Sequence, residues 1–257
     1  MIDSHCHIND PAYLSDPARY VKEAKEAGVD TLIVVGYDLK SSLDAVNIAN
    51  QYEGVFTAVG IHPSEVKRMK DNDLKEIEKL LSKDKVIAIG EIGLDYHWDK
   101  EEEIRRLQIH YFEKQIELAN KHKLPIIIHS RDAIGETLQV LTNHKVHKGG
   151  IMHCYAGSKE MVKDFAKLGF LFGIGGVVTF KNAITIKEVV KHIDSSLYVL
   201  ETDAPYLAPT PHRGEMNHSK YLPSIAEEVA SIRGEDVSTV VKNSDNNFRR
   251  VFKIWKK

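Results

Sequence analysis

Ile2-Asp3-Ser4-His5-Cys6-His7 opens the chain as a short apolar run that ends in two histidines. Four later apolar runs end in a similar way, at Glu91, at His129, at His153 and at Asp203. In a strand, residues i and i+2 point to the same side, so His5 and His7 share one face. Histidines and carboxylates are costly to bury at strand ends unless something binds them. A shared metal centre is the simplest single explanation for all five endings.

Between these runs the sequence alternates strand and helix patterns, without a linker or a change of composition. Predicted strands, short and rich in Val, Ile, Leu or Phe, lie at 2–6, 31–36, 55–61, 86–91, 125–129, 149–153, 169–174 and 197–203. Predicted helices run from Asp16-Pro17 to Gly28 and near 41–52, 73–82, 101–123, 132–144, 158–168, 184–192, 221–233 and 235–254.

Strands that alternate with helices in this way predict an α/β fold, a (β/α)₈ TIM barrel of the metal-dependent hydrolase type. We expect one domain over residues 1–257. A doubly wound open sheet is the main alternative. Its sites gather at one switch point, so it would not need ligand-type residues at five separate strand ends.

Length and charge set wider limits. A chain of 257 residues can bury a large core. Its net charge of −2 does not indicate nucleic-acid binding, although the chain can still carry a local basic rim. We expect no membrane span and no signal peptide, since no window is long and apolar enough for a span and no basic leader precedes an apolar run. Cys6 and Cys154, the only cysteines, form a poor disulfide framework, which favours a cytoplasmic location.

In a barrel, catalytic groups collect at the mouth formed by the carboxyl ends of the strands. Six ligand-type residues should converge there: His5, His7, Glu91, His129, His153 and Asp203. Six are too many for one tetrahedral site with an open position, but they suit two divalent cations that share a carboxylate. We expect His5, His7 and Asp203 on one ion, and His129 and His153 on the other, with Glu91 as the bridge. Nitrogen and oxygen ligands suit Zn, Mn, Co, Fe or Mg, and the sequence does not choose among them.

Several residues beside the ligands have predicted roles in catalysis. Asp203 is the predicted general base, with a role as ligand only as its alternative, and Glu91 is the second catalytic carboxylate. Glu201 lies two residues before Asp203 and should sit one layer deeper, where it orients a ligand histidine. His62, in Gly60-Ile61-His62-Pro63, either contacts the substrate or fixes its own loop.

The substrate side of the mouth has weaker signals. Arg131 and Arg213 are candidates to hold a phosphate. Aromatic residues that follow the strands are candidates to stack on the bases of a single strand, with loop packing as the alternative: Tyr96, Trp98, Tyr155, Phe180 and Tyr206. Seven further histidines are predicted at the surface: His97, His110, His122, His144, His147, His192 and His218. Cys6 and Cys154 are predicted to be packing residues that face outward.

The motifs around these residues are Asp3-Ser4-His5-Cys6-His7, Gly60-Ile61-His62-Pro63, Gly90-Glu91-Ile92-Gly93-Leu94-Asp95-Tyr96, His129-Ser130-Arg131, His153-Cys154-Tyr155 and Glu201-Thr202-Asp203-Ala204-Pro205-Tyr206. Together they resemble, from end to end, the TatD-type metal-dependent deoxyribonucleases. The resemblance implies a two-metal centre on the same six residues, and hydrolysis of DNA phosphodiesters. It also implies 3′-to-5′ exonuclease action on single strands with magnesium or another divalent ion. The chain departs from the family at Ser219, where relatives often have proline, and at residues 243–247, so details of substrate holding differ.

Two other functions compete with a nuclease. An amidohydrolase-type enzyme would cut an amide or ester bond in a small metabolite or in aminoacyl-tRNA. Many such enzymes bridge their metals with a carboxylated lysine on the fourth strand, where this chain has Glu91, and this favours the nuclease. A non-catalytic metal-binding protein would not need an open coordination position. The sequence does not predict the oligomeric state.

Overall fold

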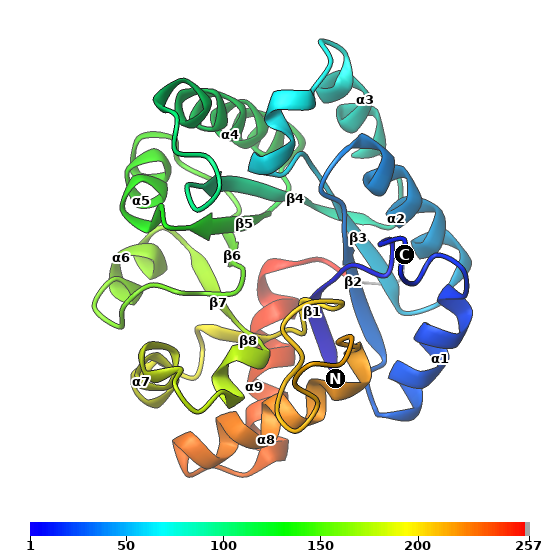
Figure 1. Ribbon diagram of the computed structural model, residues 1–257, viewed down its shortest axis with the longest axis vertical. Helices are drawn as coiled ribbons and strands as arrows, with labels where there is room; N and C mark the ends of the chain where they lie inside the picture. Colours follow the sequence, from blue (N-terminus) through cyan, green and yellow to red (C-terminus); the bar gives the residue numbers. More distant parts are fainter. Residues whose placement is uncertain (255–257) are drawn as a thin grey trace.

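Eight short apolar runs pair side by side in chain order to form one parallel sheet. The strands are β1 (Ile2–Cys6), β2 (Thr31–Val35), β3 (Val55–Val59), β4 (Val86–Asp95), β5 (Ile126–Arg131), β6 (Gly150–Met152), β7 (Phe170–Ile174) and β8 (Tyr198–Leu200). The sheet curls into a ring, which is closed by hydrogen bonds from Asp203 N to His5 O (2.9 Å) and from His7 N to Ala204 O (2.7 Å). This computed structural model describes residues 1–254 (Figure 1). The predicted (β/α)₈ fold is confirmed, and residues 255–257 of the predicted domain lie outside the described residues.

Helices surround the ring; most of them connect successive strands, and two follow the last strand (Figure 1). They are α1 (Pro17–Glu26), α2 (Leu39–Gln51), α3 (Asp73–Leu80), α4 (Glu102–His122), α5 (Ile134–Asn143), α6 (Val162–Lys167), α7 (Ile184–His192), α8 (Leu222–Arg233) and α9 (Val237–Val251), with 3₁₀ turns η1 (Pro63–Arg68), η2 (Gly176–Thr179) and η3 (Ser219–Tyr221). Local sequence fixes several ends. The Asp16 side chain accepts from Arg19 N at the start of α1, and Asp38 and Ser41 form a capping box on α2. Within residues 1–254, no helix is long and apolar enough to cross a membrane.

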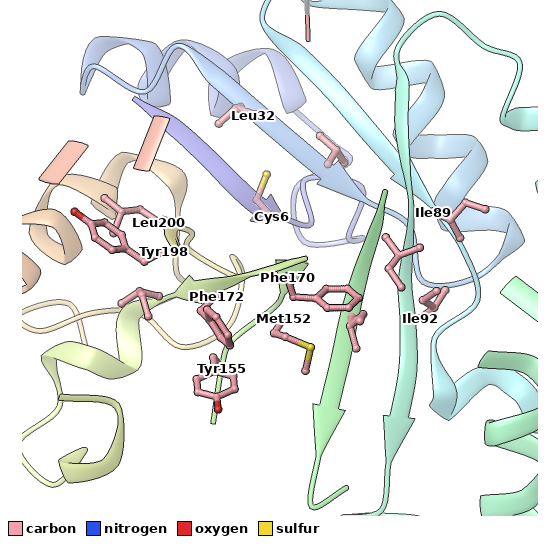
Figure 2. Close-up of a cluster of buried hydrophobic side chains, with 14 of the residues drawn as sticks. Cys6, Leu32, Ile89, Ile92, Met152, Tyr155, Phe170, Phe172, Tyr198 and Leu200 are labelled. Atoms are coloured by element: carbon pink, nitrogen blue, oxygen red, sulfur yellow. The ribbon is translucent and has the colours of Figure 1, made fainter. Parts of the chain in front are cut away.

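The core consists of two layers, one on each face of the sheet. Ile33 and Val35 of β2 belong to a cluster that takes a side chain from every strand and fills the barrel. Leu32 and Val34 belong to a larger cluster between the strands and the helices. Figure 2 shows labelled members of this outer cluster, such as Phe172 on β7. Apolar residues thus fill both faces, as expected of a buried parallel sheet.

The helix α9 closes the end of the barrel where the strands begin. Phe248 and Phe252 join the inner cluster, and Ile2 N donates to the Asp245 side chain at 2.9 Å. Figure 1 shows α9, in red, behind the ring. Because this end is plugged, polar groups can gather only at the opposite mouth, where the strands end.

Two strand boundaries differ from the prediction in ways that shape the mouth. β4 continues past Glu91 to Asp95, while β8 stops at Leu200, before Glu201 and Asp203. The pairing of β1 with β2 also shifts by one residue between Asp3 and Cys6. Such a bulge re-aims side chains, and here it separates Asp3, whose carboxylate bonds to Thr202 and Ser219, from the face of His5 and His7.

Candidate metal centre

The mouth of the barrel brings together the six residues predicted from the strand ends. His5 Nε2 and His7 Nε2 lie 3.0 Å apart, and Asp203 Oδ1 lies 3.9 Å and 3.5 Å from them. These three atoms surround a point about 2.0 Å from each of them, which matches metal–nitrogen and metal–oxygen bonds of about 2.0–2.2 Å. Two imidazole lone pairs at this separation repel each other unless a proton or a cation lies between them. The donors present therefore fit a divalent cation.

Glu91 faces two groups of histidines with its two oxygens. Oε2 lies 3.5 Å from His5 Nε2 and 3.6 Å from His7 Nε2. Oε1 lies 2.9 Å from His129 Nδ1 and 3.9 Å from His153 Nε2. Both oxygens of the carboxylate thus face nitrogen donors, as a ligand shared by two cations requires. The groups of potential ligands differ from the predicted partition, because His153 falls with His5 and Glu91, and His129 falls with His62 and Asp95.

Neighbouring groups orient the histidine rings. His7 Nδ1 donates to Val35 O at 2.8 Å, which leaves the Nε2 lone pair for the site. His153 Nδ1 lies 3.0 Å from Glu201 Oε1, so its Nε2 also points into the site, 3.6 Å from Asp203 Oδ1. The His5 and His153 rings stack with their centroids 3.5 Å apart. Packing and polar contacts therefore hold these rings in place before any ligand binds.

Electrostatic coupling within the cluster is strong. Burial opposes ionisation of Glu91, yet the surrounding histidines, His5 and His129 among them, hold its pKa well below the usual value. Burial disfavours the charged form of His153, but Glu201 and Asp203 raise its pKa to about 10. Burial also disfavours the charged form of His129, but Asp95 and Glu91 raise its pKa to about 9. Without a cation, ring protons supply the positive charge that the carboxylates need, and a metal would displace these protons.

Asp95 is a site residue that the sequence reading missed. Its Oδ2 lies 3.0 Å from His129 Nε2, and His62, Asp95 and His129 form one cluster of potential ligands. Both ring nitrogens of His129 thus meet carboxylates, Glu91 on one side and Asp95 on the other. Period-two alternation along β4 puts Asp95 on the same face as Glu91. The sequence pattern therefore predicts Asp95 at the site if the strand is taken to continue to residue 95. The predicted strand ends at Glu91, four residues before the end of β4.

One of the two roles predicted for His62, fixing its own loop, is confirmed, and the other, contact with the substrate, stays a prediction. Its Nδ1 accepts from Ser64 N at 3.1 Å at the start of η1, so the side chain fixes its own loop. Its Nε2 lies 3.8 Å from Glu91 Oε1 and lines the cavity over the site. Burial and the neighbouring His129 lower the pKa of His62 to about 3, so the ring is neutral.

Glu201 lies one layer beneath the site, fully buried. Its Oε1 accepts from Cys154 N at 2.6 Å, and its carboxylate occupies space beside Gly173, where an added Cβ would lie 2.3 Å from Oε2. The prediction that Cys154 faces outward is wrong, because this residue turns at a φ of 43° and lines the cavity. Cys6 does face the outer cluster and contacts Ile33 O.

A cavity of about 670 Å³ opens above the cluster. Arg131 lines it, whereas Arg213 does not and instead lies over the Phe180 ring at 3.8 Å. Of the predicted aromatic contacts, Tyr96 and Tyr155 are buried in the core, while Trp98 and Tyr206 are exposed and line the cavity. His218 is also buried, stacked on Tyr20 at 3.8 Å, so its predicted surface position is wrong.

Known proteins resemble this chain in both sequence and fold. The family model described as TatD related DNase matches residues 2–253. The uncharacterized metal-dependent hydrolase YabD of Bacillus subtilis is 38% identical over 255 residues, with 99% of each chain covered. A 3′-5′ ssDNA/RNA exonuclease TatD of Erwinia billingiae is 30% identical, also with 99% of each chain covered. The crystal structure of the TatD homologue YjjV of Escherichia coli superposes with a TM-score of 0.94 at 27% identity, covering 99% of this chain and 98% of that one. The chain therefore belongs to the TatD family of metal-dependent hydrolases.

Proposed function

We propose that this protein is a divalent-metal-dependent nuclease that hydrolyses phosphodiester bonds of DNA from the 3′ end of single strands. The observation that carries the proposal is the placement of Glu91 between two sets of histidines, with one oxygen toward each. Two adjacent cations suit phosphodiester hydrolysis, because the attacking and the leaving oxygen both need stabilisation. The relative of Erwinia billingiae named as a 3′-5′ ssDNA/RNA exonuclease supports the same reaction.

In this proposal His5, His7 and Asp203 hold one cation, and His129 and His153 hold the other, with Glu91 shared. Magnesium, manganese and zinc are the candidates. The cations, when bound, acidify water and neutralise charge on the phosphate. Asp95 and Glu201 keep His129 and His153 in position by contacts of 3.0 Å each.

The protein side chains then supply proton transfer and orientation. Asp203 accepts the proton of the attacking water, because its carboxylate is ionised. Burial opposes this ionisation, but His153 and His7 outweigh burial and lower the pKa of Asp203. Arg131, at the end of β5 and on the wall of the cavity, contacts a phosphate oxygen of the substrate. His62 contacts the same phosphate from the side of η1. A neutral ring there donates a hydrogen bond without adding charge.

The test uses metal-loaded protein and 5′-labelled single-stranded DNA, beside a panel of amide and ester substrates. A 3′-to-5′ exonuclease produces a ladder of shortened 5′-labelled fragments, and a phosphorothioate at the 3′ end stops it. Asp203→Asn and His129→Ala should abolish the ladder. Glu188→Gln, on the exposed face of α7, serves as the matched control and should leave it unchanged.

Each other outcome has a defined meaning. A ladder that persists in Asp203→Asn points to a contaminating nuclease and contradicts the proposal. Cleavage of only the amide or ester substrates would contradict the nuclease function and support the amidohydrolase-type reaction. Metal binding without any hydrolysis would support the alternative of a non-catalytic metal-binding protein.

We also propose a cytoplasmic location, because Cys6 and Cys154 are both free thiols.

A further inference from the structure

Two aromatic side chains at the mouth are exposed in a way that burial does not explain. Trp98 is 72% exposed and Tyr206 is 55% exposed. Both line the cavity over the metal centre. Large aromatic side chains normally bury most of their surface, and a ring left open on the wall of a cavity is suited to contact with a bound ligand.

Topology places these two residues on opposite sides of the mouth. Trp98 follows β4, and Tyr206 follows β8. In a ring of eight strands in the order β1 to β8, these two strands lie four positions apart in either direction. Figure 1 shows β4 and β8 across the ring from each other. A chain molecule that crosses the mouth between Trp98 and Tyr206 must therefore pass over the cluster at its centre.

Each aromatic ring is held in place by contacts that leave part of it open. The Arg131 guanidinium lies 5.6 Å from the Trp98 ring centroid, within cation–π range, and the His97 ring packs edge-on at 4.6 Å. The Tyr206 hydroxyl donates to Asp10 Oδ2 at 3.5 Å, and its ring lies edge-on to His7 with centroids 6.3 Å apart. Such contacts fix a ring without covering it, which reduces the entropy lost when a ligand stacks on it.

From this arrangement, and on the basis of the proposed function, we infer that Trp98 and Tyr206 are two stacking platforms for bases. They hold the bases on either side of the bond that lies over the metal centre. Every base has a π-face, so the platforms accept any sequence. In a duplex those faces are occupied by neighbouring base pairs. The platforms thus select single strands, while Arg131 beside Trp98 attracts the backbone.

The test measures affinity separately from cleavage. Binding of a phosphorothioate single-stranded oligonucleotide to the magnesium-loaded protein is followed by anisotropy, beside an abasic oligonucleotide of equal length. Trp98→Ala and Tyr206→Ala should each weaken binding of the base-containing strand by about 5- to 150-fold, the loss expected for one stacked base. Binding of the abasic strand should change little. Trp98→Phe should keep most of the affinity, and Leu43→Ala, an exposed apolar control on α2, should keep all of it.

Equal affinity for the base-containing strand in wild type, Trp98→Ala and Tyr206→Ala would overturn the inference. An equal loss for the abasic strand would also overturn it, because the aromatic residues would then act through folding or charge. A wild-type protein that binds neither strand has the same consequence. A protein that binds single strands through these residues but does not cleave natural DNA would support the inference and contradict the proposed nuclease function.

Discussion

Two replacements of Glu201 should distinguish its effect on metal affinity from its effect on the stability of the fold. The Glu201 carboxylate is fully buried, accepts from Cys154 N at 2.6 Å and lies 3.0 Å from His153 Nδ1. Glu201→Gln keeps the shape and one acceptor oxygen for Cys154 N, but it removes the charge that orients His153. Loss of a partner that orients a metal ligand typically lowers metal affinity by about 10- to 100-fold, or roughly 1.4–2.7 kcal/mol.

Glu201→Ala removes the acceptor as well. The Cys154 N–H and the Nδ1 atom of His153 are then both left without a partner in a buried place. Breaking a buried ion pair costs about 3–5 kcal/mol, so this variant should also lose that much stability.

Titration calorimetry with zinc or manganese measures the first effect, and urea unfolding of the metal-free protein measures the second. Glu188→Gln on the surface of α7 is the control for both measurements. If Glu201→Gln binds metal as tightly as the wild type, Glu201 does not position His153. If Glu201→Ala is as stable as the wild type, the buried contacts of Glu201 do not hold this part of the barrel together.

Three further predictions concern other parts of the structure. Asp95→Asn should lower kcat/KM for DNA by about 10- to 100-fold, because it removes the charge beside His129; an unchanged value would exclude this role for Asp95. Gly173→Ala should cost about 1–3 kcal/mol of unfolding free energy in urea, because its Cβ would lie 2.3 Å from Glu201 Oε2, and the penalty should shrink in the Glu201→Ala background. Burial and Lys220 lower the pKa of His218 to about 4, below its unfolded value near 6.5, so protonation of the unfolded chain should reduce stability by at most about 3 kcal/mol as the pH falls from 6.5 to 4. In His218→Asn this part of the pH dependence should disappear from urea unfolding curves, and a stability difference from wild type that is equal at pH 7 and pH 5 would contradict it.

The sequence alone determined the barrel and six of the ligand-type residues at its mouth. Apolar runs of strand length alternate with helical patterns, and this local periodicity specifies the fold without any knowledge of long-range contacts. Parallel strands all end on the same side of such a barrel, so His5, Glu91, His129, His153 and Asp203 had to converge. Their convergence follows from topology, and the structure places them accordingly.

Only the tertiary structure decided which atoms face each other. The bulge in β1 turns Asp3 away from the face of His5, although strict alternation would have kept them together. The extension of β4 adds Asp95 to the cluster, and the turn after β6 brings Cys154 into the cavity. Arg131 reaches the mouth while Arg213 packs on Phe180. Bulges, strand ends and loop paths depend on packing between distant segments, and no local pattern encodes that packing.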